Sequence, residues 1–436
     1  INNKKEIYKQ LLSLIKKFIT MKKMLFCAIS AAAMLSACSS EENISSNPAG
    51  EALTPKIQLG VATAASTTTR GTGTVGGITP EENVWAGQDL WIYMLEKGTM
   101  KATKYVDPDP SIEPVKIFDN KKFTAPVGAG EEGKENSGLA STADGKVEYY
   151  PINGASDFWG YRVDNACGGD PVVKTVNNEG TEVDESEATK RVVNITIDGS
   201  QDIMAGKAEI TEEEKAKLGN RTNDYFSAYA ARKGVQPNIN FKHLLTRFTF
   251  HVKAGSPSAA GNGTNTDPVK VTSISVEGKN KGQLTVAYTG AEPQSLLTFE
   301  DTTAPFKLMQ RQGEDHNSTL KDLTPTALTW TAGEGEGSVG AADNIAIGEA
   351  LLVAPGEESY TLNVGLSQKV LKMIGSEKED MKLNYTATFQ APNGKFEAGK
   401  SYDINITVYG LEKIDVRATL TPWENGGSID IDDDQK

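Results

Sequence analysis

Residues 402–420 read YDINITVYGLEKIDVRATL, and this stretch decides the fold class. Apolar residues stand at every second position in two successive runs, first Tyr402, Ile404, Ile406 and Val408 and then Ile414, Val416, Ala418 and Leu420. A period of two places these side chains on one face of a strand, with Asp, Asn, Thr and Arg on the other. Two such runs at short spacing predict antiparallel strands that cover a core on one side.

The same alternation recurs at Tyr360–Leu366, Leu383–Phe389, Val192–Asp198 and Pro55–Thr63. Composition agrees, because 42 glycines and an aromatic content of 7% accompany abundant Ser, Thr and Asn, as in strands joined by many turns. Helix-period segments are few, and only Thr211-Glu-Glu-Glu214 predicts a capped short helix. We therefore predict an all-β protein built from antiparallel β-sandwiches.

The length of 436 residues is enough for two or three domains, each with its own core. A Gly-x-x-Pro turn at Gly234–Pro237 divides two strand-rich halves. We expect an N-terminal sandwich over residues 54–235, whose first strand lies within 54–70. A C-terminal sandwich is expected over 236–436.

Met21–Cys38 (MKKMLFCAISAAAMLSAC) is the clearest targeting signal in the chain. Two lysines precede an apolar run that is too short to span a bilayer, and small residues lead to Cys38. This ending resembles the lipobox of bacterial lipoproteins, in which the cysteine thiol accepts a diacylglycerol. The resemblance implies that residues 1–37 are an upstream segment and signal peptide, with Met21 as the start. Residues 38–53 are then a polar tether behind a lipidated Cys38.

Charge and cysteine content exclude several function classes. The formal charge is −13, and because residues 1–37 are basic the chain from Cys38 onward is near −19. Such an acidic protein is a poor partner for nucleic acid. Of the 3 cysteines only Cys167 lies outside the signal region, so no internal disulfide and no cysteine metal cluster is expected.

No residues are predicted to be catalytic or to bind a cofactor or metal. The sequence lacks a Gly-x-Ser-x-Gly elbow, a His-Glu-x-x-His pair and a Walker loop, although two carboxylates could still form a glycosidase site. Gly71-x-Gly73-x-x-Gly76 has no strand–turn–helix context, which makes it a weak dinucleotide motif. His243 and His251 have no third ligand nearby, so they are better explained as structural histidines.

Arg70 is the only charged residue in a small-residue loop, Ala64–Gly77. An exposed arginine in such a loop is accessible to a trypsin-like, arginine-specific protease. Cleavage after Arg70 would separate the strand that carries Ile57, Leu59 and Val61 from the rest of the chain.

Several motifs together resemble the fimbrillin family, the subunits of type V pili in Bacteroidales and their lipoprotein relatives. They are Asp202-Ile-Met-Ala205, Phe241-Lys-His-Leu-Leu-Thr-Arg-Phe248, Gly394-Lys-Phe-x-Ala-Gly-Lys-Ser-Tyr402-Asp-Ile-Asn-Ile-Thr407 and Ile414-x-Val-x-Ala-x-Leu-Thr-Pro-Trp423. The lipobox and Arg70 add to the resemblance. It implies two transthyretin-like antiparallel β-sandwich domains in tandem and a C-terminal donor strand within 411–433.

Two functions follow as hypotheses. In the first, the chain is a structural pilus subunit anchored at the outer membrane and serving adhesion. Ile57, Leu59 and Val61 fill a groove until cleavage, and the donor residues Ile414, Val416, Ala418 and Leu420 of a neighbour then enter it. In the second, the chain is a monomeric surface lipoprotein that binds glycan or host protein. An exposed aromatic platform with Trp159 or Trp330 would favour that second function.

Overall fold

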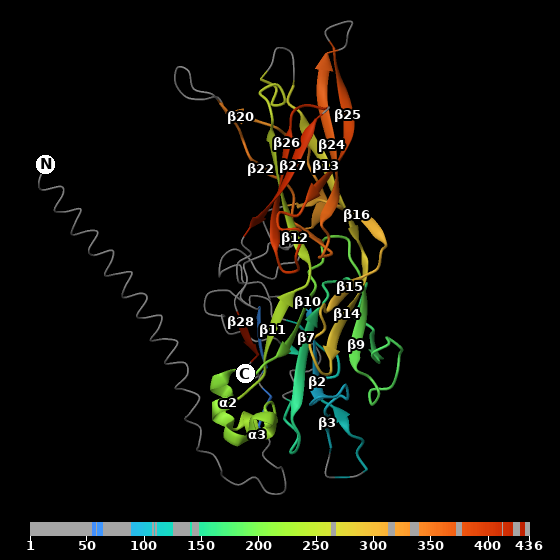
Figure 1. Ribbon diagram of the computed structural model, residues 1–436, viewed down its shortest axis with the longest axis vertical. Coiled ribbons are helices and arrows are strands. Elements are labelled where there is room, and N and C mark those ends of the chain that lie inside the picture. The colour runs from blue at the N-terminus through green and yellow to red at the C-terminus, as the bar shows by residue number, and fades with distance from the viewer. Residues whose placement is uncertain are drawn as a thin grey trace, which may run out of the picture. The chain divides into compact units, whose positions relative to one another are not determined.

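The structure is a computed structural model of the chain (Figure 1). The residues that it describes are 55–57, 59–63, 89–106, 109, 111–124, 140–141, 148–262, 267–312, 319–331, 340–371, 377–411, 413–421 and 428–431. All of them belong to one compact unit, Thr54–Lys436. Cys38 and Arg70 lie outside the described residues, so their predicted roles stay predictions.

The all-β fold class is confirmed, because strands make up most of the described chain. The largest sheet, called here the large sheet, has eight strands in the order β28-β1-β11-β10-β7-β2-β5-β6. These strands are β28 (Ser428–Ile431), β1 (Leu59–Thr63), β11 (Asn238–His243), β10 (Met204–Ala208), β7 (Ser156–Arg162), β2 (Asp89–Glu96), β5 (Lys121–Thr124) and β6 (Ala140–Ser141). Every neighbouring pair is antiparallel except β1 and β11, which are parallel.

A four-stranded small sheet packs on one face of the large sheet. It contains β15 (Leu297–Phe299), β14 (Lys281–Tyr288), β9 (Lys190–Thr196) and β8 (Val173–Val176). Trp159 of β7 meets Tyr288 of β14 edge-on, with ring centroids 4.5 Å apart. The inward rows of both sheets contribute to one buried cluster, which makes this pair of sheets a sandwich.

Two further sheets form a second sandwich. The β12 sheet consists of β22 (Ile345–Ala346), β12 (Thr246–Ala254), β26 (Ser401–Val408), β27 (Ile414–Thr421) and β23 (Leu351–Val353). The β24 sheet consists of β16 (Thr303–Lys307), β13 (Lys270–Lys279), β24 (Ser359–Leu371), β25 (Lys378–Gln390) and β19 (Thr326–Ala327). Two-stranded pairs complete the described strands: β3 (Lys104–Tyr105) with β4 (Val115–Lys116), β17 (Met309–Arg311) with β18 (Leu320–Asp322), and β20 (Trp330–Thr331) with β21 (Ala341–Ala342).

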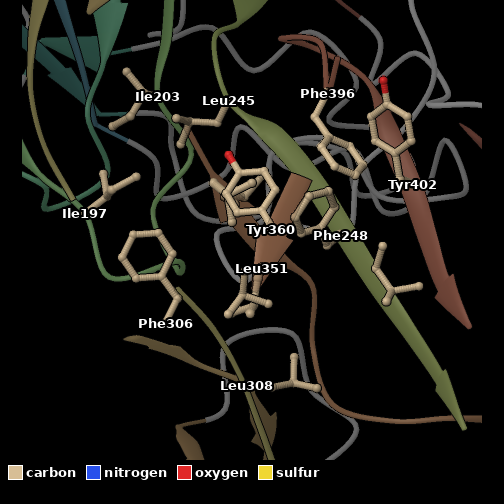
Figure 2. Packing of buried hydrophobic residues seen from close by; sticks show 14 of the residues in the cluster. Ile197, Ile203, Leu245, Phe248, Phe306, Leu308, Leu351, Tyr360, Phe396 and Tyr402 are labelled. Atoms are coloured by element: carbon tan, nitrogen blue, oxygen red, sulfur yellow. The ribbon is translucent and has the colours of Figure 1, made fainter. Parts of the chain in front are cut away.

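An aromatic cluster joins the β12 and β24 sheets (Figure 2). The Phe248 ring lies within 5.3 Å of the rings of Tyr360, Phe389 and Phe396, measured between centroids. The alternation predicted for residues 402–408 is confirmed, because Tyr402, Ile404, Ile406 and Val408 are all fully buried. The period-two pattern therefore identified the inward face correctly.

The short helices lie between β10 and β11. The predicted capping box is present at α2 (Glu212–Leu218), where the Thr211 side chain accepts a hydrogen bond from the Glu214 amide and the Glu214 carboxylate accepts one from the Thr211 amide. The 3₁₀ helix η3 (Gly219–Asp224) and α3 (Ala228–Ala231) were not predicted. Four residues are too few to display a helical period, so α3 leaves no pattern in the sequence.

The expected division into domains at residues 235/236 stays a prediction. Strand β11 follows that position yet belongs to the large sheet, and β14 and β15 pair with β9 in the small sheet. The chain passes into the β12 sheet between His243 and Thr246. The described strands on either side of residue 236 thus share two sheets.

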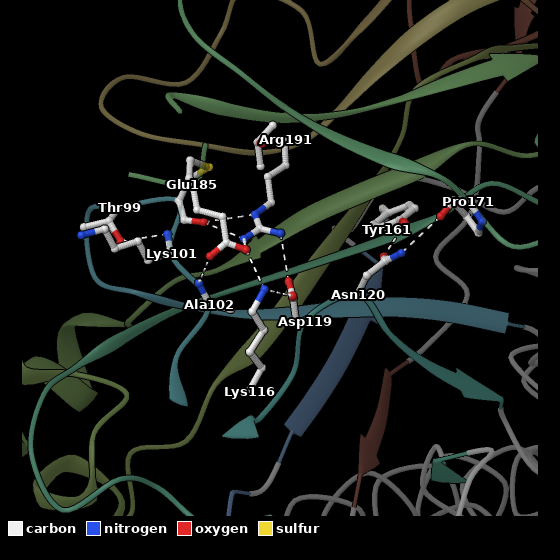
Figure 3. A network of polar contacts seen from close by, with 12 residues as sticks. Thr99, Lys101, Ala102, Lys116, Asp119, Asn120, Tyr161, Pro171, Glu185 and Arg191 are labelled. Carbon is white, nitrogen blue, oxygen red and sulfur yellow. Dashed lines mark hydrogen bonds and ion pairs between the residues drawn. The ribbon is translucent and has the colours of Figure 1, made fainter. Parts of the chain in front are cut away.

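A buried ion network fixes the loops around the small sheet (Figure 3). The Arg191 guanidinium donates to the Asp119 carboxylate at 2.9 Å and to the Met100 carbonyl at 2.6 Å. Glu185 pairs with both Arg191 and Lys116, at 3.2 and 2.7 Å. Burial alone would raise the pKa of Glu185, but these two cations hold it below its ordinary value. The network is structural, since it ties three loops to β9.

Candidate functional site

The first strand lies in the interior of the large sheet, between β11 and β28. Its backbone pairs in parallel with β11 from Gly60↔Asn238 to Thr63↔Phe241, and antiparallel with β28 from Leu59↔Ile431 to Ala62↔Ser428. A strand with neighbours on both sides has its N–H and C=O groups used on both edges. Removing it would therefore leave two rows of backbone groups without partners.

The residues just before β1 are also held by hydrogen bonds. The Ile57 amide donates to the Glu148 carbonyl at 2.9 Å, and the Tyr150 amide donates to the Pro55 carbonyl at 3.2 Å. The Gln236 side chain donates to the Lys56 carbonyl at 3.2 Å. This segment is thus anchored by residues from two distant parts of the chain, 148–150 and 236.

A second buried cluster, which we call the first-strand core, lies on the large sheet under the helices. Ile57 and Leu59 belong to it and are only 6% and 2% exposed. The other members come from strands, helices and loops between residues 90 and 241: Leu90, Ile92, Met94, Ile117, Phe118, Phe123, Tyr150, Phe158, Met204, Ala208, Leu218, Phe226, Ala228, Ala230, Val235, Ile239 and Phe241. Losing the first strand would uncover part of this core.

Ile57 and Leu59, two of the three residues predicted to fill the groove, are therefore buried in the first-strand core. The backbone of Val61, the third predicted residue, pairs with Ile239 and Ile429. Their role as groove fillers stays a prediction, because the structure shows only the state in which the first strand is bound in the sheet.

The predicted donor residues lie on β27, at the edge of the β12 sheet. They pair with β26 along their whole length, from Val408↔Ile414 to Tyr402↔Leu420. Ile414 is buried, Val416 and Ala418 pack against the core, and Leu420 is 44% exposed. Among the described strands, β27 pairs with β26 alone and does not reach the first strand.

The segment that does reach the first strand is β28, and sequence reasoning did not predict this contact. Ile429 and Ile431 alternate with polar residues, which is the pattern of a strand. Alternation reports a strand but does not identify its neighbour. The pairing partner could not be read from that pattern.

A compact charged cluster occupies the junction between β11 and β12. Arg162 is 1% exposed and pairs with Asp164 at 3.0 Å, while its guanidinium donates to the Asp202 carbonyl at 3.0 Å. His243 lies with its Nδ1 3.0 Å from the Asp202 carboxylate, and Arg247 donates to the Ser401 hydroxyl at 3.1 Å. His243 is thus a structural histidine, as expected.

The pKa values in this cluster have opposing shifts. Burial would raise the pKa of Asp202, yet His243, Arg162 and Arg247 together hold it below its ordinary value. For Asp164 burial is the larger effect, and its pKa is raised despite the neighbouring Arg162. Asp202, His243 and Arg247 all come from motifs that carry the fimbrillin resemblance, so these motifs mark an internal structural cluster.

No exposed aromatic platform is formed by the tryptophans considered in the sequence. Trp159 is 3% exposed, and the Lys207 ammonium lies 4.5 Å above its ring. Trp330 is half-buried and packs against the main core. Both rings are used in packing, so this feature does not favour the binding-protein alternative.

The described residues form neither a metal-binding cluster nor a membrane-spanning helix. Among them, no group of three or more His, Cys, Asp or Glu side chains is arranged to hold a metal ion. No helix in the described part of the chain has the length and apolar character needed to cross a membrane.

Comparison with known proteins identifies the family. The family model described as fimbrillin-like matches residues 69–423. The chain belongs to the fimbrillin-like family. The resemblance inferred from the motifs is thereby confirmed, and the match covers β2 to β27 of this fimbrillin-like protein.

Solved structures of related folds are similar to this fimbrillin-like protein at low identity. A fimbrial protein from Bacteroides vulgatus has 13% identity and a TM-score of 0.43, covering 85% of this chain and 99% of its own. A putative cell adhesion protein from Bacteroides uniformis has 15% identity, a TM-score of 0.35 and coverages of 86% and 100%. The fimbrial anchor protein Mfa2 from Porphyromonas gingivalis has 11% identity, a TM-score of 0.24 and coverages of 84% and 99%. No curated protein matches the sequence.

Proposed function

We propose that this fimbrillin-like protein is a structural subunit of a cell-surface pilus that serves adhesion. In this proposal the chain is exported as a lipoprotein, cleaved after Arg70 and polymerised by strand exchange. One observation carries it: a short strand near the N-terminus occupies an interior place in the large sheet and contributes to a buried core. Membership of the fimbrillin-like family supports the same function. The proposed role is therefore structural, not enzymatic.

Cleavage after Arg70 would leave the first strand held by non-covalent contacts alone. Its departure would expose the part of the first-strand core under Ile57 and Leu59 and free one edge of β11. Exposed apolar area costs about 25 cal/mol per Å², and unpaired backbone groups add to that cost. An extended segment from another subunit restores both contacts by β-augmentation.

The donor in this proposal is β27, with Ile414, Val416, Ala418 and Leu420 entering the groove. As an edge strand β27 has a single hydrogen-bonded neighbour, so its release breaks one ladder and not two. The β12 sheet loses the burial of Ile414 when this happens, and the groove compensates by burying Leu420, which is exposed in the monomer. Each subunit then has one groove and one donor, which builds an open head-to-tail fibre.

The decisive experiment is protease treatment of Arg70→Ala. We expect wild type to form fibres after treatment with an arginine-specific protease, and the variant to remain monomeric because its first strand stays covalently attached. Negative-stain microscopy and size-exclusion chromatography measure the outcome. Arg221→Ala is the matched control, since Arg221 is an exposed arginine on η3 and lies outside the Ala64–Gly77 loop. Fibres from the Arg70 variant in the same yield as wild type would refute cleavage at this residue.

A second prediction tests the donor without altering the folded monomer. Leu420→Asp places a carboxylate on a residue that is 44% exposed, so the monomer should fold normally. In the fibre the same charge would be buried in an apolar groove, and we expect fibre formation to be lost. Thr419→Asp, one residue away on the exposed face of β27, should polymerise like wild type. Equal fibre yields from both variants would exclude β27 as the donor.

A third prediction concerns the outer-membrane anchor. Cys38→Ala should abolish labelling by a radioactive or clickable fatty acid and leave the protein in the periplasm, because the thioether needs a thiol at that position. Cys167→Ala should label normally, since Cys167 lies in the folded body. Undiminished labelling of Cys38→Ala would rule out the lipobox interpretation.

A further inference from the structure

The last described strand of the chain is bound to the first. β28 pairs antiparallel with β1 through Leu59↔Ile431, Gly60↔Asp430, Val61↔Ile429 and Ala62↔Ser428. Within the described residues β28 pairs with no other strand, and it forms the edge of the large sheet. Its place in the fold therefore depends on β1.

We propose that β28 is a latch that keeps the donor segment closed until the first strand is removed. This inference rests on the strand-exchange function proposed above and assigns its regulation. Residues 422–427 alone connect β27 to β28, so β27 is held at both ends while β28 stays on β1. In that state β27 cannot swing away from β26 as an extended arm.

Sheet geometry explains why removal of β1 opens the latch. Neighbouring strands lie about 4.8 Å apart, so the strands on either side of β1 are separated by about 10 Å. That gap is too wide for β28 to form hydrogen bonds with β11 once β1 has gone. The pairing that held β28 is lost. Without hydrogen bonds to a neighbour, nothing offsets the conformational entropy that an ordered edge strand loses, so β28 leaves the sheet.

The direction of the strands argues against self-closure of the empty groove. β1 runs parallel to β11, whereas β28 runs antiparallel to β1 and therefore antiparallel to β11. Moving β28 into the place of β1 would reverse the strand direction there and change the whole hydrogen-bond pattern. One cleavage thus opens the groove and frees the donor of the same subunit.

The latch can be tested by separating donors from acceptors. The acceptor is a Leu420→Asp chain that has been cleaved, so that it has an open groove and no working donor. Three donors are mixed with it: cleaved wild type, uncleaved Arg70→Ala, and Arg70→Ala truncated after Gly427, which lacks β28. Native mass spectrometry measures the amount of heterodimer formed with each donor.

We expect cleaved wild type and the truncated chain to donate, and the uncleaved full-length chain to donate about tenfold less or not at all. A latch contributing only about 1.4 kcal/mol changes this equilibrium tenfold. Equal donation by both uncleaved chains would overturn the latch while leaving strand exchange intact. The latch would also be overturned if cleaved wild type donates and the truncated chain does not. Failure of cleaved wild type as well would refute strand exchange, and the latch with it.

Two further experiments test the latch without the truncated chain, so that misfolding of that chain does not decide the result. Alternate residues of an edge strand direct their N–H groups to the neighbouring strand, so one of the two variants Ile429→Pro and Asp430→Pro removes a hydrogen bond to β1, and that variant should donate as the truncated chain does. A disulfide tests the register: in a Cys167→Ala background, Ala62→Cys with Ser428→Cys joins directly opposed residues, whose Cα atoms lie about 4.5–5.5 Å apart in such pairs. The offset pair Ala62→Cys with Asp430→Cys should not cross-link. Cross-linking of the offset pair alone would contradict the latch.

Discussion

An Asp202→Ala variant is expected to lose about 3–5 kcal/mol of unfolding free energy, because it removes one partner from a buried charged cluster. Asp202 is 1% exposed, and its carboxylate lies against His243 and Arg162. Without it, the Arg162 guanidinium remains buried with Asp164 as its remaining anionic neighbour. Urea denaturation followed by circular dichroism measures the loss as a lower midpoint.

The control for this change is Asp301→Ala. Asp301 pairs with Lys279 at 3.1 Å, but its side chain is 97% exposed. Water screens that pair, so its removal should cost no more than about 1 kcal/mol. A midpoint for Asp202→Ala as close to wild type as that of the control would show that the cluster does not stabilise the fold.

The same carboxylate gives the cluster a pH dependence. The unfolded-state pKa of an aspartate is about 3.9, and the folded-state pKa of Asp202 lies lower. A depressed pKa contributes stability that is fully present above the unfolded value and is lost as the pH falls through the folded value. The difference in unfolding free energy between wild type and Asp202→Asn should therefore shrink as the pH falls below about 4. Asp164 lies in the same cluster, and the Asp202 charge is one of the influences that raise its pKa, so Asp202→Asn also removes that influence.

A Phe389→Ala variant is expected to lose about 3–5 kcal/mol through lost burial and the cavity left behind. Phe389 is 1% exposed, and its ring centroid lies 5.3 Å from that of Phe248 and 5.7 Å from that of Phe396. Because packing density in such a cluster is high, the remaining rings cannot fill the space without leaving their rotamers. Chemical denaturation gives the loss directly.

The neighbouring residue on the same strand supplies the matched control. Thr388 is exposed, so Thr388→Ala should change stability by about 0.5 kcal/mol or less. Ile406→Ala on β26, which removes a fully buried side chain, should resemble Phe389→Ala, with a loss of about 2–5 kcal/mol. The reverse order of midpoints at residues 388 and 389 would mean that the register of β25 is shifted by one residue.

Local patterns predicted the strands well, because alternation is a property of each strand by itself. The face of β26 and the capping box at Thr211 were readable from neighbours in sequence, whereas on β27 the predicted inward face holds at Ile414 and fails at Leu420, which is exposed at the end of the strand. Asn238–Lys253 could be read as a strand pair or one kinked strand. The structure shows two strands in different sheets, joined at Leu244 and Leu245. Alternation does not reveal that the sheet changes, since both strands bury alternate residues.

The arrangement of the candidate site was less predictable than its strands. The buried first-strand residues Ile57 and Leu59 followed from their spacing, but the contact between β1 and β28 joins residues more than 360 positions apart. The cluster of Asp202, His243 and Arg162 was missed for the same reason, because its members lie far apart in sequence. Single residues such as these have no periodicity, and only the folded chain brings them together.

The parallel pairing of β12 with β26 has a consequence for the way the chain folds. These strands match from Arg247↔Ser401 to Ala254↔Val408, so the central ladder of the β12 sheet joins residues 154 positions apart. During synthesis β12 appears first, and more than a hundred further residues must follow before its partner strand is available. Non-local pairings of this kind form slowly, and the unfinished sheet exposes Phe248 and its aromatic neighbours meanwhile. Aggregation is therefore a greater hazard for the incomplete chain than for the folded protein.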